Sequence, residues 1–411
     1  MKRGLDVNKK YLPSALVLYL NYFIHGVGCS VLGQAVIKEA LATSWNVEVM
    51  TITAISAALG LGRLIALPFA GPLSDKLGRR ISVVIGGASY AIFLMGLAFA
   101  FNMGPNGGYQ IAYICAIVGG IANSFLDTGI YPAVAEIIYS APGVATMGIK
   151  FFIAISQMLL PFFLGVTVSV TAAGLTSYNR LFIICGVAYI ILLALIIFFP
   201  LPDTDKGEGA AKKEGLIASL KHTKFSAGSI AMILIGFTCT GTFQLWLNCA
   251  QNFAKNVVGW DDPSIMQSYY SIGTILALIV TAFLTRKIKD VRFIIAYPAI
   301  CLVTLIAVLV IPSRALCIAG AFIIGWAGAG GLLQIATSVC NMLFPKIKGT
   351  VTALVMIASS LCNYTILTAA SQMTPSGVLV MNIVITGIGV ALGLFVNLNY
   401  DKMLEDAKSA V

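Results

Sequence analysis

The chain contains 411 residues, of which 59% are hydrophobic and only 10% are charged, and its formal net charge is +10. Because an average soluble domain carries about 25% charged residues, this composition excludes an ordinary soluble enzyme. A mean hydropathy of +0.93 requires apolar stretches along the whole chain, and their long, unbroken runs exclude a β-barrel, whose strands alternate. We therefore predict an all-α polytopic membrane protein.

Twelve apolar segments follow one another along the chain, each near the ~20 residues that a helix needs to cross ~30 Å of hydrocarbon. Their approximate bounds are 12–37, 49–72, 81–101, 109–136, 143–170, 180–200, 227–254, 264–285, 291–311, 315–341, 349–372 and 376–398. The one long polar stretch, 201–225, separates the sixth segment from the seventh. We therefore expect a six-helix bundle at 1–200, a cytoplasmic linker at 201–225 and a second six-helix bundle at 226–411.

The distribution of lysine and arginine predicts how these segments are oriented. With the N-terminus in the cytoplasm, 21 of the 26 basic residues fall in cytoplasmic segments, four fall outside and Arg63 lies within a segment. This bias follows the positive-inside rule, so we expect both termini in the cytoplasm and the protein in a plasma or bacterial inner membrane. The positive charge then reflects contact with anionic membrane lipids and not with nucleic acid. The same count assigns Lys150 to a cytoplasmic loop and Lys38 to an outer loop.

The first two segments carry polar residues that are candidates for a binding site. Asn21 and His25 lie four residues apart on one face of the first predicted helix, and Arg63 lies in the second. Ionisable groups at membrane depth are costly, so each is a functional candidate by default. Two alternatives stay open: His25 as a neutral core histidine, and Arg63 as a residue that extends toward the cytoplasm.

A short motif with glycines, one acid and three basic residues joins the second and third segments. It reads Gly-Pro-Leu-Ser-Asp-Lys-Leu-Gly-Arg-Arg over residues 71–80. It resembles the loop 2–3 signature of the major facilitator superfamily at every defined position, and a degenerate copy without the acid and the glycine occupies 284–289. With the twelve segments and the linker, the resemblance covers nearly the whole chain. It implies two pseudo-symmetric six-helix bundles that rock about a midplane site by alternating access.

The resemblance also implies a gating role for this motif. Asp75 is expected to cap a neighbouring helix or to accept hydrogen bonds from basic side chains. Arg79 or Arg80 is expected to reach an acid at the cytoplasmic end of another helix. Glu136, at the end of the fourth segment, resembles that acid. The alternative is a solvated charge cluster that only fixes topology.

The fourth and fifth segments add the remaining candidates of the first half. They are Asn123, Asp127 and Tyr131, at four-residue spacing, and Gln157. At ~1.5 Å per residue, Asp127 and Arg63 both lie roughly 13 Å from the cytoplasmic ends of their segments. By the resemblance both approach the cavity of the first bundle, which favours an Arg63–Asp127 pair or a proton relay between Asp127 and His25. A structural neutralisation of the two charges is the alternative.

In the second half, uncharged polar and aromatic side chains recur on the seventh, eighth, tenth and eleventh segments. The candidates for substrate contact are Gln244, Asn248, Tyr269, Trp326, Gln334 and Asn363. The resemblance implies that segments 1, 4, 7 and 10 line the pore with 2, 5, 8 and 11 beside them. Hydrogen bonding or packing between helices is the alternative for each residue. The glycine-rich run at 325–331 is expected to let the tenth helix bend or pack closely.

Other function classes lack their motifs in this sequence. There is no Walker motif, H-E-x-x-H or G-x-S-x-G and there are only two histidines, so we expect no ATP-driven transport by this chain, no enzyme activity and no metal or cofactor. The nine cysteines lie in apolar stretches and are interpreted as packing residues. Of the Gly-Pro-rich pattern that many drug/proton antiporters of the family carry on the fifth helix, only Pro161 and Gly165 occur, which weakens an efflux function.

We therefore predict a secondary active transporter that works as a monomer. One arginine, one acid and one histidine among amides and hydroxyls suit a small organic anion, such as a carboxylate, taken up with a proton by a symporter. Asp127 and His25 are the candidates for proton coupling. Two alternatives stay open: uptake or efflux of a neutral or amphipathic compound such as a sugar, drug or metabolite, with Arg63 only neutralising Asp127, and a membrane receptor of the same fold without transport.

Overall fold

The computed structural model describes residues 9–169, 177–202, 226–284, 287–344 and 348–409, and these ranges contain helices and no strand. The chain divides into two compact units, Met1–Gly207 and Glu208–Val411. The boundary falls within the predicted linker at 201–225, of which residues 203–225 lie outside the described residues. Each unit has its own hydrophobic core.

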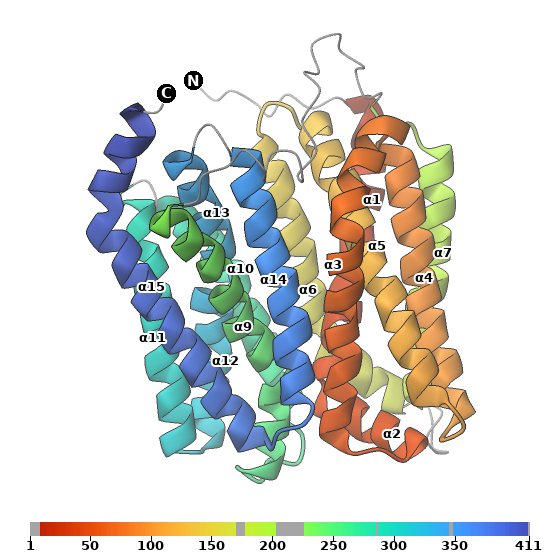
Figure 1. The fold of residues 1–411 in the computed structure, drawn as a ribbon. Coiled ribbons are helices and arrows are strands. Elements are labelled where there is room, and N and C mark those ends of the chain that lie inside the picture. The colour runs from red at the N-terminus through yellow and green to blue at the C-terminus, as the bar shows by residue number, and fades with distance from the viewer. Residues whose placement is uncertain (1–8, 170–176, 203–225, 285–286, 345–347, 410–411) are drawn as a thin grey trace. The chain divides into compact units, whose positions relative to one another are not determined.

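Over its described residues, the N-terminal unit has six long helices and one short one (Figure 1). In chain order they are α1 (Leu12–Ser30), α2 (Ala35–Trp45), α3 (Thr53–Leu77), α4 (Arg79–Met103), α5 (Gly108–Ile137), α6 (Pro142–Ser169) and α7 (Ser177–Phe198). Three 3-10 turns, Lys9–Tyr11, Val31–Gly33 and Val49–Ile52, flank α1 and precede α3. The main contacts join α4 to α5 and α7, α3 to α5, and α1 to α6.

Two glycines bring α3 and α5 into close contact next to the polar candidates. A Cβ added at Gly62 would lie 1.9 Å from the carbonyl oxygen of Ile117, and one added at Gly120 would lie 2.1 Å from that of Leu59. Only glycine therefore permits this approach of the two backbones. Because Arg63 follows Gly62 directly, the contact holds Arg63 beside α5.

The end of the first predicted segment, 12–37, is wrong. α1 ends at Ser30, and Gln34 has extended backbone angles (φ −74°, ψ 127°) that interrupt the helix before α2 begins. In Figure 1, α2 lies across one end of the unit and does not continue α1. The buried residues of α2 include Ile37, Leu41 and Trp45 at four-residue spacing. This spacing gives α2 an apolar face of its own. Because the apolar residues of α1 and α2 follow one another closely in the sequence, the predicted segment ran from α1 into the start of α2.

The position predicted for Lys38, in an outer loop, is also corrected. Its side chain is fully buried in α2, and its Nζ donates to Thr53 Oγ1 at 2.7 Å, at the start of α3. The ring N–H of Trp45 donates to the carbonyl oxygen of Ala100 at 2.8 Å. These two bonds fasten α2 to α3 and α4.

The C-terminal unit has a similar set of helices over its described residues. They are α9 (Ala227–Asn256), α10 (Ile265–Leu284), α11 (Asp290–Val310), α12 (Arg314–Ile323), the π-helix η4 (Ile324–Ala329), α13 (Leu332–Leu343), α14 (Lys348–Ala370) and α15 (Pro375–Ser409). A capping box of Ser226 and Ser229 starts α9. Helix α9 packs on α14 and α15, and α15 also packs on α11.

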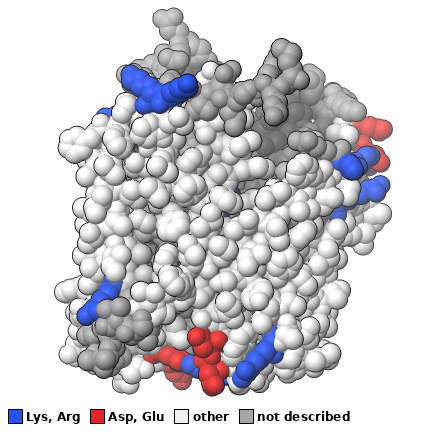
Figure 2. All heavy atoms as spheres, turned by 180° about the vertical axis from the view of Figure 1, so that it is seen from behind, with Lys and Arg blue, Asp and Glu red and all other residues white. Residues whose placement is uncertain are grey.

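Eleven helical stretches in the described ranges are long and apolar enough to cross a bilayer, with α12, η4 and α13 counted as one, and α10 is a shorter apolar helix. Together they occupy the twelve predicted segments. Figure 2 shows a wide uncharged band on one face, with the charged side chains toward the helix ends. This distribution is typical of a protein that spans a membrane.

The tenth predicted segment, 315–341, is interrupted in its middle. The helix widens into η4, and Gly331 has φ 151°, a conformation that favours glycine, before α13 begins. A Cβ at Gly325 would lie 2.0 Å from the carbonyl oxygen of Tyr270, so α10 and η4 are in close contact there. Thr274 Oγ1 donates to the Gly325 carbonyl at 3.1 Å. The glycine-rich run was expected to let the helix bend or pack closely; the structure shows the close packing and, in addition, an interruption of the helix.

Candidate functional site

The N-terminal unit brings three helices together at Asp127, on α5. Arg63 Nη2, on α3, lies 2.7 Å from Asp127 Oδ2, and the hydroxyl of Tyr22, on α1, donates to Asp127 Oδ1. Both carboxylate oxygens therefore have a donor. The side chains of Arg63 and Asp127 are 33% and 30% exposed, so the pair remains accessible. The sequence predicted the proximity of Arg63 and Asp127 as one option but gave no sign of Tyr22, because a tyrosine in an apolar run is usually a packing residue.

Aromatic rings enclose the α1 side of this carboxylate. The ring of Tyr22 lies 5.3 Å from that of His25 and 5.7 Å from that of Tyr131, both in edge-on geometry. Tyr90, on α4, lies 5.1 Å from the His25 ring, and its hydroxyl donates to the His25 carbonyl at 3.2 Å. His25 and Tyr131 thus belong to the same cluster as Asp127, with Tyr22 between them.

Lys150 is a further charged member of this cluster, and its assignment to a loop is corrected. It lies within α6, eight residues after the first residue, Pro142, or ~12 Å along the helix axis. Its ammonium group interacts with the hydroxyl of Tyr131 as a hydrogen-bond donor, and its charge acts on His25 and Cys29. The charge count assigned Lys150 to a loop although the predicted segment 143–170 already contained it.

Several buried polar atoms around the cluster have no hydrogen-bond partner among the described residues. They are Arg63 Nε, His25 Nδ1, Asn123 Oδ1 and Asn21 Oδ1. A buried donor or acceptor without a partner costs about 1–3 kcal/mol, so a polar ligand that met one of them would recover part of this cost. Asn123 precedes Asp127 by one helical turn, so the two residues lie on the same face of α5.

Two predicted site residues of this unit make their side-chain hydrogen bonds outside the group around Asp127. The Asn21 amide donates to the Val17 carbonyl of its own helix at 2.8 Å, and the Asn21 side chain is 1% exposed. The Gln157 amide, on α6, donates to Ser30 Oγ at 2.6 Å and is also buried. Their positions in the predicted helices identified them as polar residues within the membrane. The sequence did not tell toward which neighbouring helix each side chain points.

The signature at 71–80 is more helical than predicted. α3 continues to Leu77 and α4 begins at Arg79, so the connection is reduced to Gly78, whose φ of 96° only glycine adopts readily. Asp75 accepts from Arg79 Nη1 at 2.9 Å, one turn away across this connection.

Arg79 also connects the signature to α5. Its Nε lies 3.6 Å from Glu136 Oε1, so one guanidinium lies between two carboxylates. Its partner Asp75 is 60% exposed, and an exposed pair contributes little stability by itself. Arg80 reaches different acceptors, the carbonyl oxygens of Ile197 and Phe199 at the end of α7, at 3.3 and 3.0 Å. The bonds of Arg79 and Arg80 thus connect α3, α4, α5 and α7 at one end of the unit.

The candidates of the C-terminal unit are uncharged. Asn248 donates to Gln244 Oε1 at 3.1 Å, one turn apart on α9. The ring of Trp326, in η4, lies 5.9 Å from that of Phe322. Asn363, on α14, has a buried side-chain oxygen without a partner among the described residues. Tyr269 and Gln334 are exposed on their helices. In the part of the chain that the structure describes, no three His, Cys, Asp or Glu side chains form a metal site.

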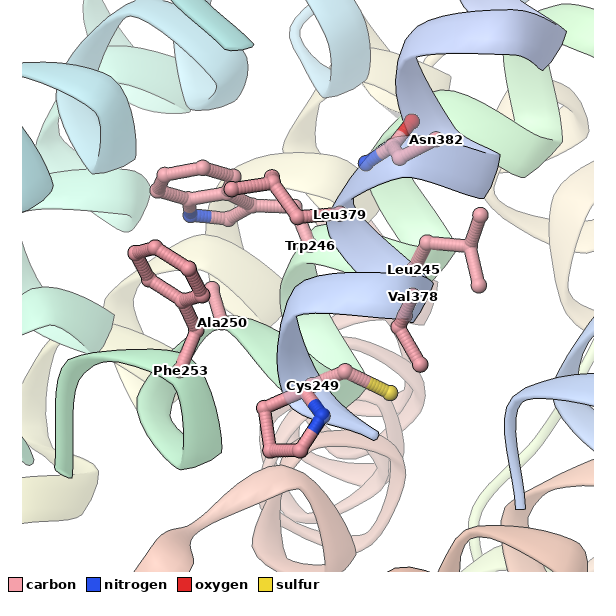
Figure 3. Close-up of a pocket in the computed structure, with 9 residues that line it drawn as sticks. Leu245, Trp246, Cys249, Ala250, Phe253, Val378, Leu379 and Asn382 are labelled. Atoms are coloured by element: carbon pink, nitrogen blue, oxygen red, sulfur yellow. The ribbon is translucent and has the colours of Figure 1, made fainter. Parts of the chain in front are cut away.

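A small cavity lies between α9 and the beginning of α15 (Figure 3). Its space, including the opening, is about 220 Å³. The lining residues are Leu245, Trp246, Cys249, Ala250, Phe253, Pro375, Val378, Leu379 and Asn382. The one amide, of Asn382, already donates to the Thr242 carbonyl at 3.1 Å. The cavity therefore offers an apolar surface and no charge, unlike the cluster around Asp127.

Comparison with known proteins adds independent information. The chain matches the family model described as Major Facilitator Superfamily over residues 18–363. An uncharacterized MFS-type transporter, YfkL of Bacillus subtilis (strain 168), is 30% identical over 402 residues, which cover 95% of this chain and 98% of the relative. The inner membrane transport protein YdiM of Escherichia coli (strain K12) is 32% identical over 408 residues, 95% of each chain.

Solved structures agree at the level of the fold. The inward open conformation of the xylose transporter XylE from E. coli has a TM-score of 0.73 over 93% of this chain and 94% of that chain. The two sequences are 17% identical. This likeness concerns the arrangement of helices and carries nothing about the substrate.

Proposed function

Because the chain belongs to the major facilitator superfamily and is a multi-pass secondary transporter of an inner or plasma membrane, we propose that it takes up a small organic anion, such as a carboxylate, together with a proton. The protein acts as a monomer in this proposal, with both termini in the cytoplasm and alternating access as the mechanism.

The charge of the polar cluster is the observation that carries this proposal. Arg63, Asp127 and Lys150 lie within helices of one unit, and their formal charges sum to +1. A charge at membrane depth is costly unless another charge or a polar ligand compensates it. A substrate with one negative charge would make the cluster neutral. A neutral substrate would leave the excess charge in place.

Proton coupling is assigned to Asp127, with His25 as the second candidate. Asp127 bonds to a cation and to a tyrosine hydroxyl, so its protonation would weaken the bond to Arg63. His25 contacts the same tyrosine ring and has a buried ring nitrogen without a partner among the described residues. Protonation and substrate binding would then affect each other reciprocally, which is what coupled uptake requires.

Gating is assigned to the ion pairs of Asp75, Arg79 and Glu136, with Arg80 on the end of α7. These bonds join four helices at one end of the N-terminal unit. A conformational step that separated these helices would have to break them, so they would bias the equilibrium between the two states of the transporter.

Transport of a neutral compound is the second candidate function, and one observation favours it. The Arg63–Asp127 distance of 2.7 Å is that of a complete ion pair, which neutralises both charges without a substrate. In that case Lys150 alone would carry the excess charge. The two candidates differ in whether an acid or its uncharged amide is transported.

The test is uptake into liposomes that contain the purified protein, with gluconate and its neutral amide gluconamide as probes of the same shape. We expect an inward proton gradient to drive accumulation of gluconate, or of lactate or 4-hydroxybenzoate in parallel assays, above the level of protein-free liposomes. Accumulation of the amides alone would favour the neutral substrate, and binding of a probe without flux would favour a receptor.

A further inference from the structure

Lys150 is the one cation of the polar cluster that lacks an acid. Arg63 has Asp127, and Arg79 has Asp75 and Glu136. Among the described residues no carboxylate forms an ion pair with Lys150, which interacts with the uncharged hydroxyl of Tyr131. The positive charge of this lysine, eight residues inside a membrane helix, is therefore not compensated by a negative charge, which is costly at membrane depth.

The direction of the Lys150 side chain argues against simple extension toward water. A lysine that extends to the membrane surface keeps its ammonium group in solvent. Lys150 instead interacts with Tyr131, on α5, and its charge acts on His25, on α1. The side chain of Lys150 is therefore directed across the helices toward the cluster.

The contacts of Lys150 are continuous with those of Asp127. The Tyr131 hydroxyl interacts with Lys150, the Tyr131 ring touches Tyr22, and the Tyr22 hydroxyl bonds to Asp127. An acid group next to Lys150 and Tyr131 would lie within the same cluster as the ion pair. It would have a charged donor and a hydroxyl donor available, which is a favourable arrangement for a carboxylate.

Arg63 is the less suitable anchor for an incoming anion. Its Nη2 already holds Asp127, and a second carboxylate beside it would repel the first. Lys150 has no such competitor. We propose that Lys150, with the hydroxyl of Tyr131, binds the acid group of the substrate, whereas Arg63 holds the coupling carboxylate of Asp127. This inference rests on the proposed transport of an organic anion and assigns its charge recognition to a residue on α6.

The test compares binding of matched acids and amides to purified protein in lipid nanodiscs. The probes are gluconate, lactate and 4-hydroxybenzoate with their amides, and the readout is the rise in melting temperature with probe concentration. We expect Lys150→Gln to weaken the preference for acid over amide by about tenfold or more, because a charged hydrogen bond is lost. Lys150→Arg keeps the charge and should retain most of the preference.

Lys402→Gln is the matched control, because Lys402 is exposed near the end of α15, and it should bind like the wild type. If Lys150→Gln does not fold, Lys150→Met, which keeps the aliphatic length, replaces it, and Tyr131→Phe provides an independent reduction of the same preference. Wild-type acid preference in Lys150→Gln or Lys150→Met overturns the assignment of Lys150. A wild-type protein that binds none of the acids in preference to its amide overturns the proposed organic-anion substrate instead.

Discussion

The two units of this transporter differ in what they place inside their membrane helices. In the N-terminal unit Arg63, Asp127 and Lys150 lie at depth, connected through Tyr22 and Tyr131. In the described part of the C-terminal unit the charged side chains lie near helix ends, and the interior carries amides and hydroxyls.

The C-terminal unit instead contains an interrupted helix. The π-helix η4 and Gly331 divide what would be a single span, and Gly325 brings η4 against α10. Its buried hydroxyls pair across helices, as Thr242 and Thr386 do at 2.8 Å between α9 and α15. In the proposed function, charge recognition and coupling therefore belong to the N-terminal unit, whereas the backbone feature most suited to local bending lies in the C-terminal unit.

The largest expected effect comes from the coupling carboxylate. Asp127→Asn should reduce proton-driven accumulation of the transported acid by about tenfold or more, the scale of a coupling free energy between two ligands. Exchange of labelled for unlabelled substrate without a gradient should persist, because Lys150 and Arg63 remain. Asp261→Asn, at an exposed position between α9 and α10, is the control. Undiminished proton-driven accumulation in Asp127→Asn would exclude Asp127 as the coupling site.

A second change tests the close contact in the C-terminal unit. Gly325→Ala would place a Cβ 2.0 Å from the Tyr270 carbonyl oxygen, and such overpacking destabilises a protein by about 1–3 kcal/mol. We expect a lower melting temperature and slower transport. Gly387→Ala is the control, because a Cβ there meets nothing within 4 Å. Equal melting temperatures for the two variants would show that the contact of α10 with η4 is not tight.

A smaller effect is expected from Tyr22→Phe. The substitution keeps the ring between His25 and Tyr131 but removes the hydrogen bond to Asp127. Because Asp127 keeps its ion pair with Arg63, we expect the loss of an ordinary net hydrogen-bond contribution of about 0.5–1.5 kcal/mol, so proton-driven uptake should fall by roughly twofold to tenfold. Tyr113→Phe, on the same unit but away from Asp127, serves as the control. Uptake equal to the wild type would mean that the hydroxyl does not assist Asp127.

The smallest effect is expected at the signature. Asp75→Asn and Glu136→Gln each remove one of two acids from Arg79, and exposed pairs contribute about 0–1 kcal/mol. Transport should slow by a few-fold, whereas binding of the probes should remain at the wild-type level, because the pairs lie away from Asp127. Wild-type transport rates in both variants at normal abundance would rule out the gating role.

Much of the fold was predictable from the sequence. The long apolar runs, the polar linker and the positions of the basic residues can be recognised from the order of residues alone. The helix α2 was not, since its apolar face merges with the end of α1 and the interruption at Gln34 depends on backbone angles. The glycine-rich run did predict the close packing of the tenth segment, but it did not locate the π-helix or the break at Gly331.

The site was predictable only in part. The depths of Arg63 and Asp127 follow from counting along two helices, so their proximity was foreseeable. Tyr22 was missed because the direction of a tyrosine hydroxyl depends on the neighbouring helix. Lys150 was missed because the charge count assigned it to a cytoplasmic loop, although it falls inside the predicted segment 143–170, which matches α6.

In the proposed mechanism the N-terminal unit separates charge recognition at Lys150 from coupling at Asp127. The double variant Arg63→Gln/Asp127→Asn removes the ion pair as a whole and leaves neither charge unpaired, which avoids the cost of a single change. In liposomes and nanodiscs, we expect this variant to bind the acid in preference to its amide as the wild type does, and to lose accumulation driven by a proton gradient. Loss of the acid preference in the double variant would contradict the account, because recognition of the anion would then depend on Arg63.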